Sequence, residues 1–340
     1  MEIQKSTTIQ DVPENQWRAL VGTDNIEQSY SWFQTIEESQ VRDMQYIFIK
    51  EKSSLQAAAC YFIDSYNAFG LNIPFVEVGS PLGMSPSVFS RTDHYTRILL
   101  EILSQPLQQT GGIAFLDLSE EQFTFMKQVI EGCIPSPPYE NTYLDLHFSD
   151  FDDYLQSLPA KNRRSVKITL NRAEKKWKLT KYTTHEFSQW KEVAHRLQSY
   201  ISAEHKNYRW LLPLSFYDAL EKYVQEEAEM MFFFKDDIPL VFSLSLNSSH
   251  TCWYKFAGID PAYRHYHAYF LLYYEGIREA IERHQNRIYF GTSNYEFKEK
   301  IGCAREPLYG LVKLHNPLLN FGLRCYIQGM KIMKKRVDFT

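Results

Sequence analysis

The sequence predicts an α/β fold with two tandem domains, each built on a mixed, largely antiparallel sheet flanked by helices. The chain has 340 residues, which is long enough for two domains of ordinary size. Hydrophobic residues make up 44% and charged residues 23%, as is typical of a folded globular protein. Strand-like runs alternate with amphipathic helical segments, and this pattern occurs once in each half. We therefore expect domains at residues 1–150 and 151–340, the second ending in a C-terminal helix.

The first half has helical segments at Trp32–Ser39, from about Asp93, and from Ser119, where Gln122 stands at capping-box spacing. The segment Ala68–Pro86 is rich in Gly and Pro, and we predict a long loop there. The expected strands are, in order, Gln45–Lys50, Gln56–Ile63, Ile113–Leu118 and Tyr143–Leu146.

The second half repeats this order of elements. Helices are expected at about Pro159–Lys176, from Thr183 to Lys206 with a capping box of Thr183 and Glu186, and from Ser215. A long helix follows Pro261, with apolar residues at helical spacing. The expected strands are Leu179–Tyr182, an antiparallel meander of Glu229–Lys235, Ile238–Leu246 and Thr251–Ile259, and a returning strand at Arg287–Phe290.

Two stretches suggest that the halves are distant copies of one another. Arg91–Ser119 and Arg264–Ser293 each read as a polar start, a helix beginning near a His/Tyr pair, and a short apolar strand that leads to Ser. The alternative is that helix–strand units of this length are common in α/β folds.

Bulk composition excludes several classes of protein. A formal net charge of −4 argues against a protein that coats DNA through overall charge. The five cysteines are scattered without a Cys-x-x-Cys pair, which favours reduced thiols over disulfides or zinc. The N-terminus lacks a signal-peptide core, and no apolar run approaches the ~20 residues that span a bilayer. We expect no transmembrane segment and a cytoplasmic protein.

A meander, a loop, a long helix and a returning strand resemble the N-acyltransferase (GNAT) superfamily, and two such units resemble its FemAB-like branch. LPAKNRRSVKITLNRAEKKWKLT is similar to the basic helix that opens the second domain there. The family's Gly…Lys…Gly stretch is matched at Gly291, Lys298 and Gly302. The resemblance implies an acyltransferase that moves an acyl or aminoacyl group onto an acceptor amine. The donor would be acyl-CoA or aminoacyl-tRNA, used as a co-substrate, and no cofactor would be bound permanently.

One departure from the family concerns the donor. Acetyl-CoA enzymes of this superfamily carry a glycine-rich loop before the long helix, so that backbone N–H groups can approach the pyrophosphate. Here the corresponding segment, Arg264–Ala268, contains no glycine. Bulky side chains should obstruct the usual CoA pose, which leaves aminoacyl-tRNA open as the donor.

Residues near this segment form the predicted site. Lys298, matched through the family motif, is a candidate for stabilising an oxyanion, and its alternative is a surface lysine. His267 is a candidate general base, because histidine titrates near neutral pH. Glu204 and His205 form another candidate acid–base pair.

His265 and His267 have no third ligand at suitable spacing, so no metal site is expected. Expected donor- or substrate-binding residues are Arg264, His265, Tyr266, Tyr254 and Asn294.

A basic tract supplies further candidates. Lys161 to Lys181 contains nine Lys or Arg and one acid, a density that attracts phosphate groups. We assign Arg163, Arg164 and Lys167 to donor binding, with a solvated helix face as the alternative. The basic residues that end the C-terminal helix suit its dipole and are interpreted as structural.

The sequence is also compatible with two other functions. The first is an aminoacyl-tRNA-dependent aminoacyltransferase acting on peptidoglycan precursors, although no long heptad pair like the tRNA-binding hairpin of those enzymes is present. The second is a catalytically silent binding or scaffold protein that keeps the fold. Gly-x-Ser-x-Gly, Walker, His-Glu-x-x-His and dinucleotide motifs are absent from the sequence.

Overall fold

The structure is a computed structural model that describes residues 1–68, 71–105, 110–137 and 139–337. Its contacts divide the chain into two compact units. The first consists of Met1–Gly22, Arg42–Glu140 and Pro307–Thr340, and the second of Thr23–Val41 and Asn141–Glu306. The units differ from the proposed domains 1–150 and 151–340 chiefly in residues 23–41 and 307–340. Side-chain packing explains the first difference, and strand pairing the second.

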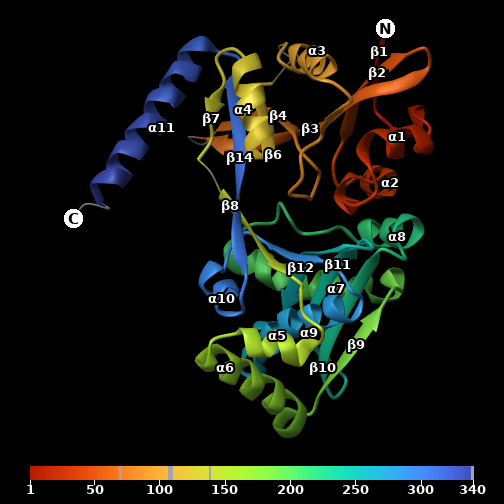
Figure 1. Ribbon diagram of the computed structural model, residues 1–340, viewed down its shortest axis with the longest axis vertical. Coiled ribbons are helices and arrows are strands. Elements are labelled where there is room, and N and C mark those ends of the chain that lie inside the picture. The colour runs from red at the N-terminus through yellow and green to blue at the C-terminus, as the bar shows by residue number, and fades with distance from the viewer. Residues whose placement is uncertain (69–70, 106–109, 138, 338–340) are drawn as a thin grey trace. The chain divides into compact units, whose positions relative to one another are not determined.

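The sheet of the first unit has the order β1-β2-β3-β4-β6-β14. Strands β1 to β4 are antiparallel neighbours, β4 and β6 are parallel, and β14 is antiparallel to β6 (Figure 1). The elements of this unit are β1 (Glu2–Ser6), α1 (Glu14–Val21), β2 (Met44–Glu51), β3 (Ser54–Ala68), β4 (Leu71–Val78), β5 (Val88–Ser90), α3 (Asp93–Leu103), β6 (Gly112–Leu118), α4 (Glu120–Val129), β7 (Ile134–Pro135), β14 (Ala304–Leu314) and α11 (Pro317–Val337).

The sheet of the second unit has the order β9-β10-β11-β12-β13-β8. Strands β9 to β12 are antiparallel, β12 and β13 are parallel, and β8 is antiparallel to β13. The elements of this unit are α2 (Tyr30–Ser39), β8 (Tyr139–Asp145), α5 (Phe151–Ser157), α6 (Ala160–Asn171), η3 (Arg172–Trp177), β9 (Leu179–Thr184), α7 (Phe187–His205), α8 (Leu214–Tyr223), β10 (Ala228–Lys235), β11 (Ile238–Asn247), β12 (Thr251–Ile259), η4 (Pro261–Tyr266), α9 (Ala268–Glu282), β13 (Arg287–Gly291) and α10 (Tyr295–Lys300).

The two units therefore share one topology, and the predicted fold class is confirmed. In each unit a meander leads into a helix, α3 or α9, and then into a strand parallel to the last strand of the meander. The strand that completes each sheet comes from the other half of the chain. Strand β8 pairs with β13, and β14 pairs with β6. This exchange carries β14, and α11 after it, into the first unit.

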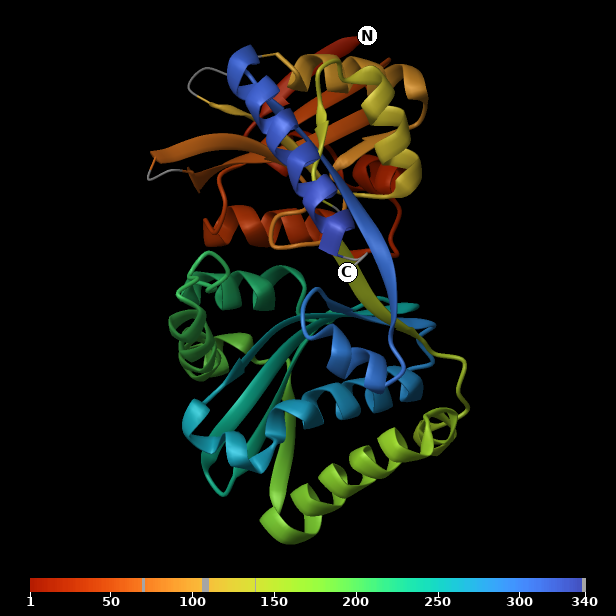
Figure 2. The same ribbon diagram turned by 90° about the vertical axis from the view of Figure 1, so that its left-hand side faces the viewer.

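Helices cover both faces of the second sheet. On one face, Gly276 of α9 lets the helix approach Tyr254, since a Cβ there would lie 2.8 Å from the tyrosine ring. On the other face, Gly258 of β12 lets α7 approach, since its Cβ would lie 2.5 Å from the backbone of Gln198. Figure 2 shows α9 running along the strands of this unit. The buried core beneath α9 includes Leu272, Ile277 and Ile288.

A buried contact also holds residues 23–41 in the second unit. Helix α2 packs on α8, and the rings of Trp32 and Phe216 meet edge to face at 5.9 Å. Both side chains are fully buried. Burial of two large aromatic rings supplies enough apolar contact to keep this N-terminal segment with α8.

Several predictions about single elements were wrong. Ala68–Pro86 is not one loop, because Leu71–Val78 forms β4; residues 69 and 70 lie outside the described residues. Helix α7 has no capping box of Thr183 and Glu186; instead the Glu186 N–H donates to Thr184 Oγ1 at 3.0 Å. The basic helix ends at Asn171, and a π-helical segment, η3, continues to Trp177. The capping box of Ser119 and Gln122 is confirmed.

Candidate active site

Strands β12 and β13 begin as a parallel pair and then separate. Their register covers three residue pairs, from Thr251 with Arg287 to Trp253 with Tyr289. Beyond this point β12 continues to Ile259 alongside β11, with Lys255 as the extra residue of a β-bulge. The backbone of β12 beyond Trp253 therefore faces the opening between the strands and pairs with no β13 residue in the described ladder. Such N–H groups can donate to a substrate carbonyl.

Lys298 lies at the β13 side of this opening and is 1% exposed. Its Nζ donates to the carbonyls of Phe290 at 2.7 Å, Gly291 at 2.9 Å and Thr292 at 3.3 Å. Burial lowers the pKa of this ammonium to about 8. The side chain thus fastens the end of β13 to α10, and the alternative of an exposed surface lysine is wrong. Its role toward an oxyanion stays a prediction.

The glycine-free segment begins in the last three residues of the 3-10 helix η4 and reaches the first residue of α9. The start of η4 is capped by the Asp260 side chain, which accepts from the Ala262 N–H at 3.0 Å. His267 follows as the N-cap of α9 with φ of 55°, a left-handed conformation that glycine adopts more readily. Arg264 forms an ion pair with Glu204 at the end of α7. Both residues were candidates from the sequence, but no motif indicates that they pair with each other.

A pocket of about 460 Å³ lies where η4, α9, α7 and the end of β12 meet. It brings together three predicted site residues, Arg264, His267 and Asn294, with Glu204 and His205. Ile259, the last residue of β12, lines it too. Since Asn294 follows β13 and Ile259 ends β12, the pocket lies at the open end of the diverging strands.

Other predicted residues do not line this pocket. Tyr254 is in the core beneath α9, where its hydroxyl lies 2.7 Å from Ser243 Oγ and donates to the Leu272 carbonyl at 2.7 Å. Burial raises the pKa of Tyr254 well above its usual value. The rings of His265 and Tyr266 lie against each other at 4.2 Å on η4. The binding roles of these three residues stay predictions.

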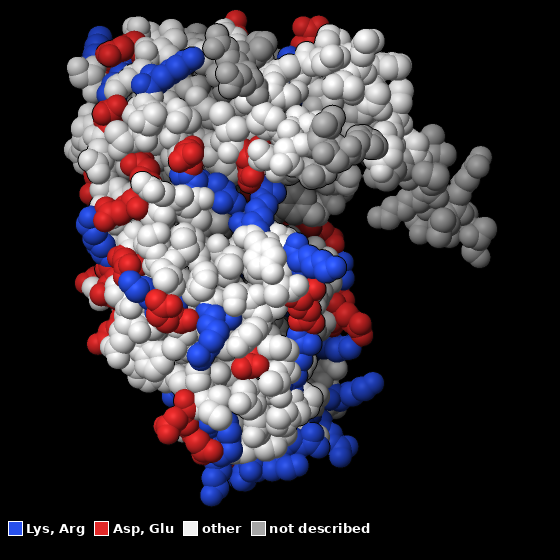
Figure 3. Space-filling view, turned by 180° about the vertical axis from the view of Figure 1, so that it is seen from behind, with Lys and Arg blue, Asp and Glu red and all other residues white. Residues whose placement is uncertain are grey.

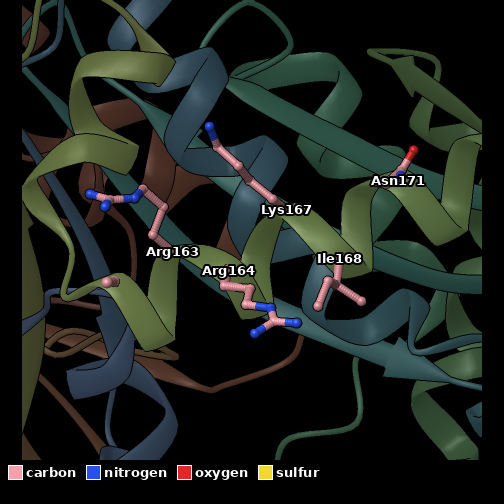
Figure 4. Close-up of a pocket in the computed structure, with 6 residues that line it drawn as sticks. Arg163, Arg164, Lys167, Ile168 and Asn171 are labelled. Carbon is pink, nitrogen blue, oxygen red and sulfur yellow. The ribbon is translucent and has the colours of Figure 1, made fainter.

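The basic residues of α6 line a shallow pocket of about 290 Å³ (Figure 4). Arg163 is tied to the turn before the helix, because it donates to the carbonyls of Gln156 at 3.1 Å and Leu158 at 3.4 Å. Arg164 and Lys167 are exposed, and no acidic side chain of the described residues pairs with them. Figure 3 shows Lys and Arg gathered along the lower edge of the molecule, where Figure 1 places α6.

Within the basic tract, Trp177 lies close to η4 and to His267, which lines the larger pocket. Trp177, the last residue of η3, lies 5.7 Å from the ring of Tyr266 and 5.9 Å from that of His267. The ammonium of Lys176 lies 5.9 Å from the Trp177 ring. A phosphate chain that follows α6 and η3 would therefore arrive at η4.

Lys255 and Glu27 form an ion pair that was not predicted from the sequence. Lys255 is the bulge residue of β12, and Glu27, fully buried, comes from the N-terminal segment of the same unit. Both side chains are held out of water, where opposite charges attract each other more strongly than they do at the surface. The sequence offers no signal for this pair, because its partners are distant and neither belongs to a motif.

The described residues contain no group of three or more His, Cys, Asp or Glu side chains arranged to hold a metal ion. Among the described helices, none has the length and apolarity required to cross a membrane.

Comparison with known proteins agrees with the resemblance to the GNAT superfamily that the sequence shows. Residues 160–299 match the family described as "Acetyltransferase (GNAT) domain". FemX is similar over 95% of this chain and 100% of its own, at 12% identity and a TM-score of 0.61. A tandem GNAT protein from the clavulanic acid biosynthesis pathway is similar over 93% and 99%, at 10% identity and a TM-score of 0.56. A conserved protein of unknown function from Bacteroides thetaiotaomicron is similar over 92% and 99%, at 11% identity and a TM-score of 0.62. No curated protein matches by sequence. The chain thus has the fold of these tandem GNAT proteins.

Proposed function

We propose that this chain is an N-acyltransferase that moves an acyl or aminoacyl group from an activated ester or thioester to an acceptor amine. The reaction takes place in the second unit, between β12 and β13. The observation that carries this proposal is the divergence of these strands after three residue pairs, with a pocket at their open end. The match of residues 160–299 to a GNAT domain supports the same chemistry. The five cysteines, none bonded to another, suit a cytoplasmic setting.

In the proposed reaction, the donor carbonyl accepts a hydrogen bond from the β12 backbone beyond Trp253. The amine nitrogen attacks the carbonyl carbon, and the new C–N bond forms as charge develops on the oxygen, where fixed N–H dipoles stabilise it. The C–O or C–S bond to the donor then breaks, and the leaving group departs with its electron pair. The proton lost by the amine passes to the ring of His267. Lys298 keeps the end of β13 in place, and proximity supplies much of the acceleration.

The donor is held through phosphate groups in this proposal. Arg264 lies at the pocket, and Arg164 and Lys167 lie on the basic tract that leads to it. The bulky residues of η4 stand where a glycine-rich loop would cradle a pyrophosphate, so CoA would bind in a different pose from the usual one.

A second candidate, an aminoacyl-tRNA donor, is favoured by one observation. Arg164 and Lys167 are exposed without an acidic partner in the described chain, and Trp177 of the same tract lies 5.9 Å from the ring of His267 at the pocket. A polyphosphate backbone neutralises several such charges at once, whereas CoA offers few phosphates.

Binding and turnover measurements would distinguish the donors. We would titrate the full chain with acetyl-CoA by calorimetry and with bulk aminoacyl-tRNA by filter binding at increasing salt. Arg164→Glu/Lys167→Glu should weaken the tRNA signal and flatten its salt dependence. Lys5→Glu/Lys52→Glu, the same charge change on exposed lysines of the first unit, is the matched control. Saturable acetyl-CoA binding supports the first donor, and salt-dependent tRNA binding supports the second. No binding by either donor, and no transfer to amines, would favour a silent scaffold.

A further inference from the structure

Trp177 is a large aromatic side chain that stays outside the core beneath α9. Val166 and Ala173 of the same helical run are buried in this core, and Leu170 packs against it. In a regular α-helix, Trp177 would continue that face, because it follows Leu170 by two turns. Among the described side chains, Leu179 on the other side of Trp177 also packs against this core, but Trp177 does not belong to it and is partly exposed.

The π-helical segment η3 accounts for this placement. It runs from Arg172 to Trp177. In a π-helix each residue bonds to the one five positions away, so a turn holds more residues than a turn of an α-helix. The wider turn rotates Trp177 away from the buried face to which Ala173 belongs. Such turns are rare and occur frequently at functional sites, so the exposure of this indole indicates a binding role.

The rings next to Trp177 belong to η4 and to the residue after it. The indole lies 5.7 Å from the ring of Tyr266 at an interplanar angle of 87°, and 5.9 Å from that of His267 at 38°. The ring of His265 lies 4.2 Å from that of Tyr266. Both histidines are exposed, and Tyr266 is partly buried. These four residues, called the ring cluster below, form a partly open aromatic surface beside the pocket that His267 lines.

Positive charge surrounds the indole. Residues 172–178 contain four Lys or Arg and one acid. Lys175 and Lys176 precede Trp177 and Lys178 follows it, and all three lysines are exposed. The ammonium of Lys176 lies 5.9 Å from the indole ring. Aromatic rings set among cations are the combination that binds nucleotides, because a base stacks on the rings while its phosphates attract the cations.

We propose that the ring cluster and the lysines around it bind an adenosine phosphate, the nucleotide that coenzyme A and the 3′ end of aminoacyl-tRNA have in common. The adenine stacks on Trp177, and the phosphates lie against the exposed lysines. The inference rests on the proposed function, since it names the part of the donor that is held beside the pocket. It also supplies a way to hold the donor without a glycine-rich loop at η4.

Calorimetric titration of the full chain tests the proposal with two nucleotide probes. Adenosine 3′,5′-bisphosphate is the nucleotide end of coenzyme A, and the trinucleotide CCA is the 3′ end of tRNA. Ribose 5-phosphate, which has no base, is the control ligand and should bind more weakly than the better nucleotide by about tenfold or more. Tighter binding of the bisphosphate supports coenzyme A as the source of the nucleotide, and tighter binding of CCA supports tRNA.

Variants of Trp177 separate stacking from charge. Trp177→Ala should weaken nucleotide binding by about tenfold or more, because the stacking partner is lost. Trp177→Phe keeps a ring and should bind within about threefold of the wild type, yet it should lose the quenching of tryptophan fluorescence that the stacked base causes. Trp210→Ala is the matched control: this side chain is 40% exposed, has Arg209 at 5.2 Å from its ring, and lies outside the ring cluster.

A charge variant tests the contact with phosphate. Lys175→Gln/Lys176→Gln should weaken nucleotide binding by about threefold or more and flatten its salt dependence. Wild-type affinity in this variant or in Trp177→Ala would overturn the inference. So would equal binding of ribose 5-phosphate, or no binding by both nucleotide probes.

The outcomes also distinguish this inference from the proposed function. Nucleotide binding that depends on Trp177, without any transfer to amines, would support the inference and contradict the acyltransferase. Transfer to amines that Trp177→Ala leaves unchanged would support the acyltransferase and overturn the inference.

Discussion

Two effects act in opposite directions on the charged ammonium form of Lys298. Burial disfavours the ammonium and lowers its pKa to about 8. The three backbone carbonyls within 3.3 Å of Nζ match the three N–H bonds of an ammonium, and a neutral amine could satisfy only two of them. At neutral pH the residue is therefore a charged clamp on residues 290–292. Its value to the site lies first in the position of the β13 backbone.

Replacing Lys298 with Met should lower both the stability of the protein and its rate of turnover. The variant keeps the length of the side chain but removes the ammonium from the Phe290 and Thr292 carbonyls, while the Gly291 carbonyl keeps the Thr142 hydroxyl as a donor. Loss of these buried hydrogen bonds costs on the order of 2–4 kcal/mol. We expect a lower urea midpoint and a lower kcat, with a smaller change in KM. Lys300→Met, which removes an exposed lysine of the same helix, is the control. An unchanged midpoint would show that the carbonyls do not need the ammonium.

Glu279 should make stability depend on pH. Burial, together with the nearby charge of Glu229, raises the pKa of this carboxyl to about 7, although Lys181 and Arg283 act in the opposite direction. Between pH 4.5 and 7 the native state then binds more protons than the unfolded state, so the free energy of unfolding falls as pH rises through this range. Glu279→Gln should reduce this fall by on the order of 2 kcal/mol, measured by urea unfolding at pH 5 and pH 8. Glu275→Gln controls for loss of a bond to Lys181. Equal pH dependence in Glu279→Gln and the wild type would contradict the assignment.

At the scale of single elements, sequence patterns predicted most helices and the strands of the second meander, because both depend on local periodicity. Strand β4 was missed because Pro74 interrupts it and Gly and Pro surround it. The structure tolerates Pro74 because the parallel pairing with β6 begins only at Phe75, so no hydrogen bond to β6 depends on that nitrogen.

The site was predicted only in part, for a different reason. Arg264, His267 and Asn294 follow from motif positions, and the structure brings them to one pocket. The partner of Arg264 comes from α7, and that of Lys255 from before α2. Such contacts arise from packing between distant segments, which no local pattern encodes.

Two glycines give opposite predictions for the elements that carry them. Gly258→Ala would push a Cβ to within 2.5 Å of the α7 backbone, and we expect a loss of stability of about 1–3 kcal/mol. Gly322→Ala on α11 meets nothing within 4 Å, so the better helix former should leave stability unchanged or raise it by about 0.5–1 kcal/mol. Thermal unfolding of both variants checks the pair. Similar melting temperatures for the two variants would mean that α7 does not pack closely on β12 at Gly258.

On the scale of the whole molecule, each sheet depends on both halves of the chain. A break between His147 and Phe148 would leave β8 on one fragment and its partner β13 on the other, and would likewise separate β14 from β6. Either fragment alone would expose an unpaired strand edge and should aggregate. Co-expressed fragments should co-purify and unfold together. Two fragments that each stay soluble and unfold cooperatively by themselves would contradict the strand exchange.

The same exchange delays completion of the first sheet while the chain is being synthesised. The N-terminal meander, α3 and β6 leave the ribosome early, yet the β6 edge stays unsatisfied until Ala304–Leu314 has been translated. Translation proceeds at about 5–20 residues per second, so the β6 edge stays unpaired for roughly 10–40 s between the synthesis of Leu118 and that of Leu314. We expect a nascent chain stalled before residue 304 to bind a holdase chaperone, and one stalled well beyond Leu314 to release it.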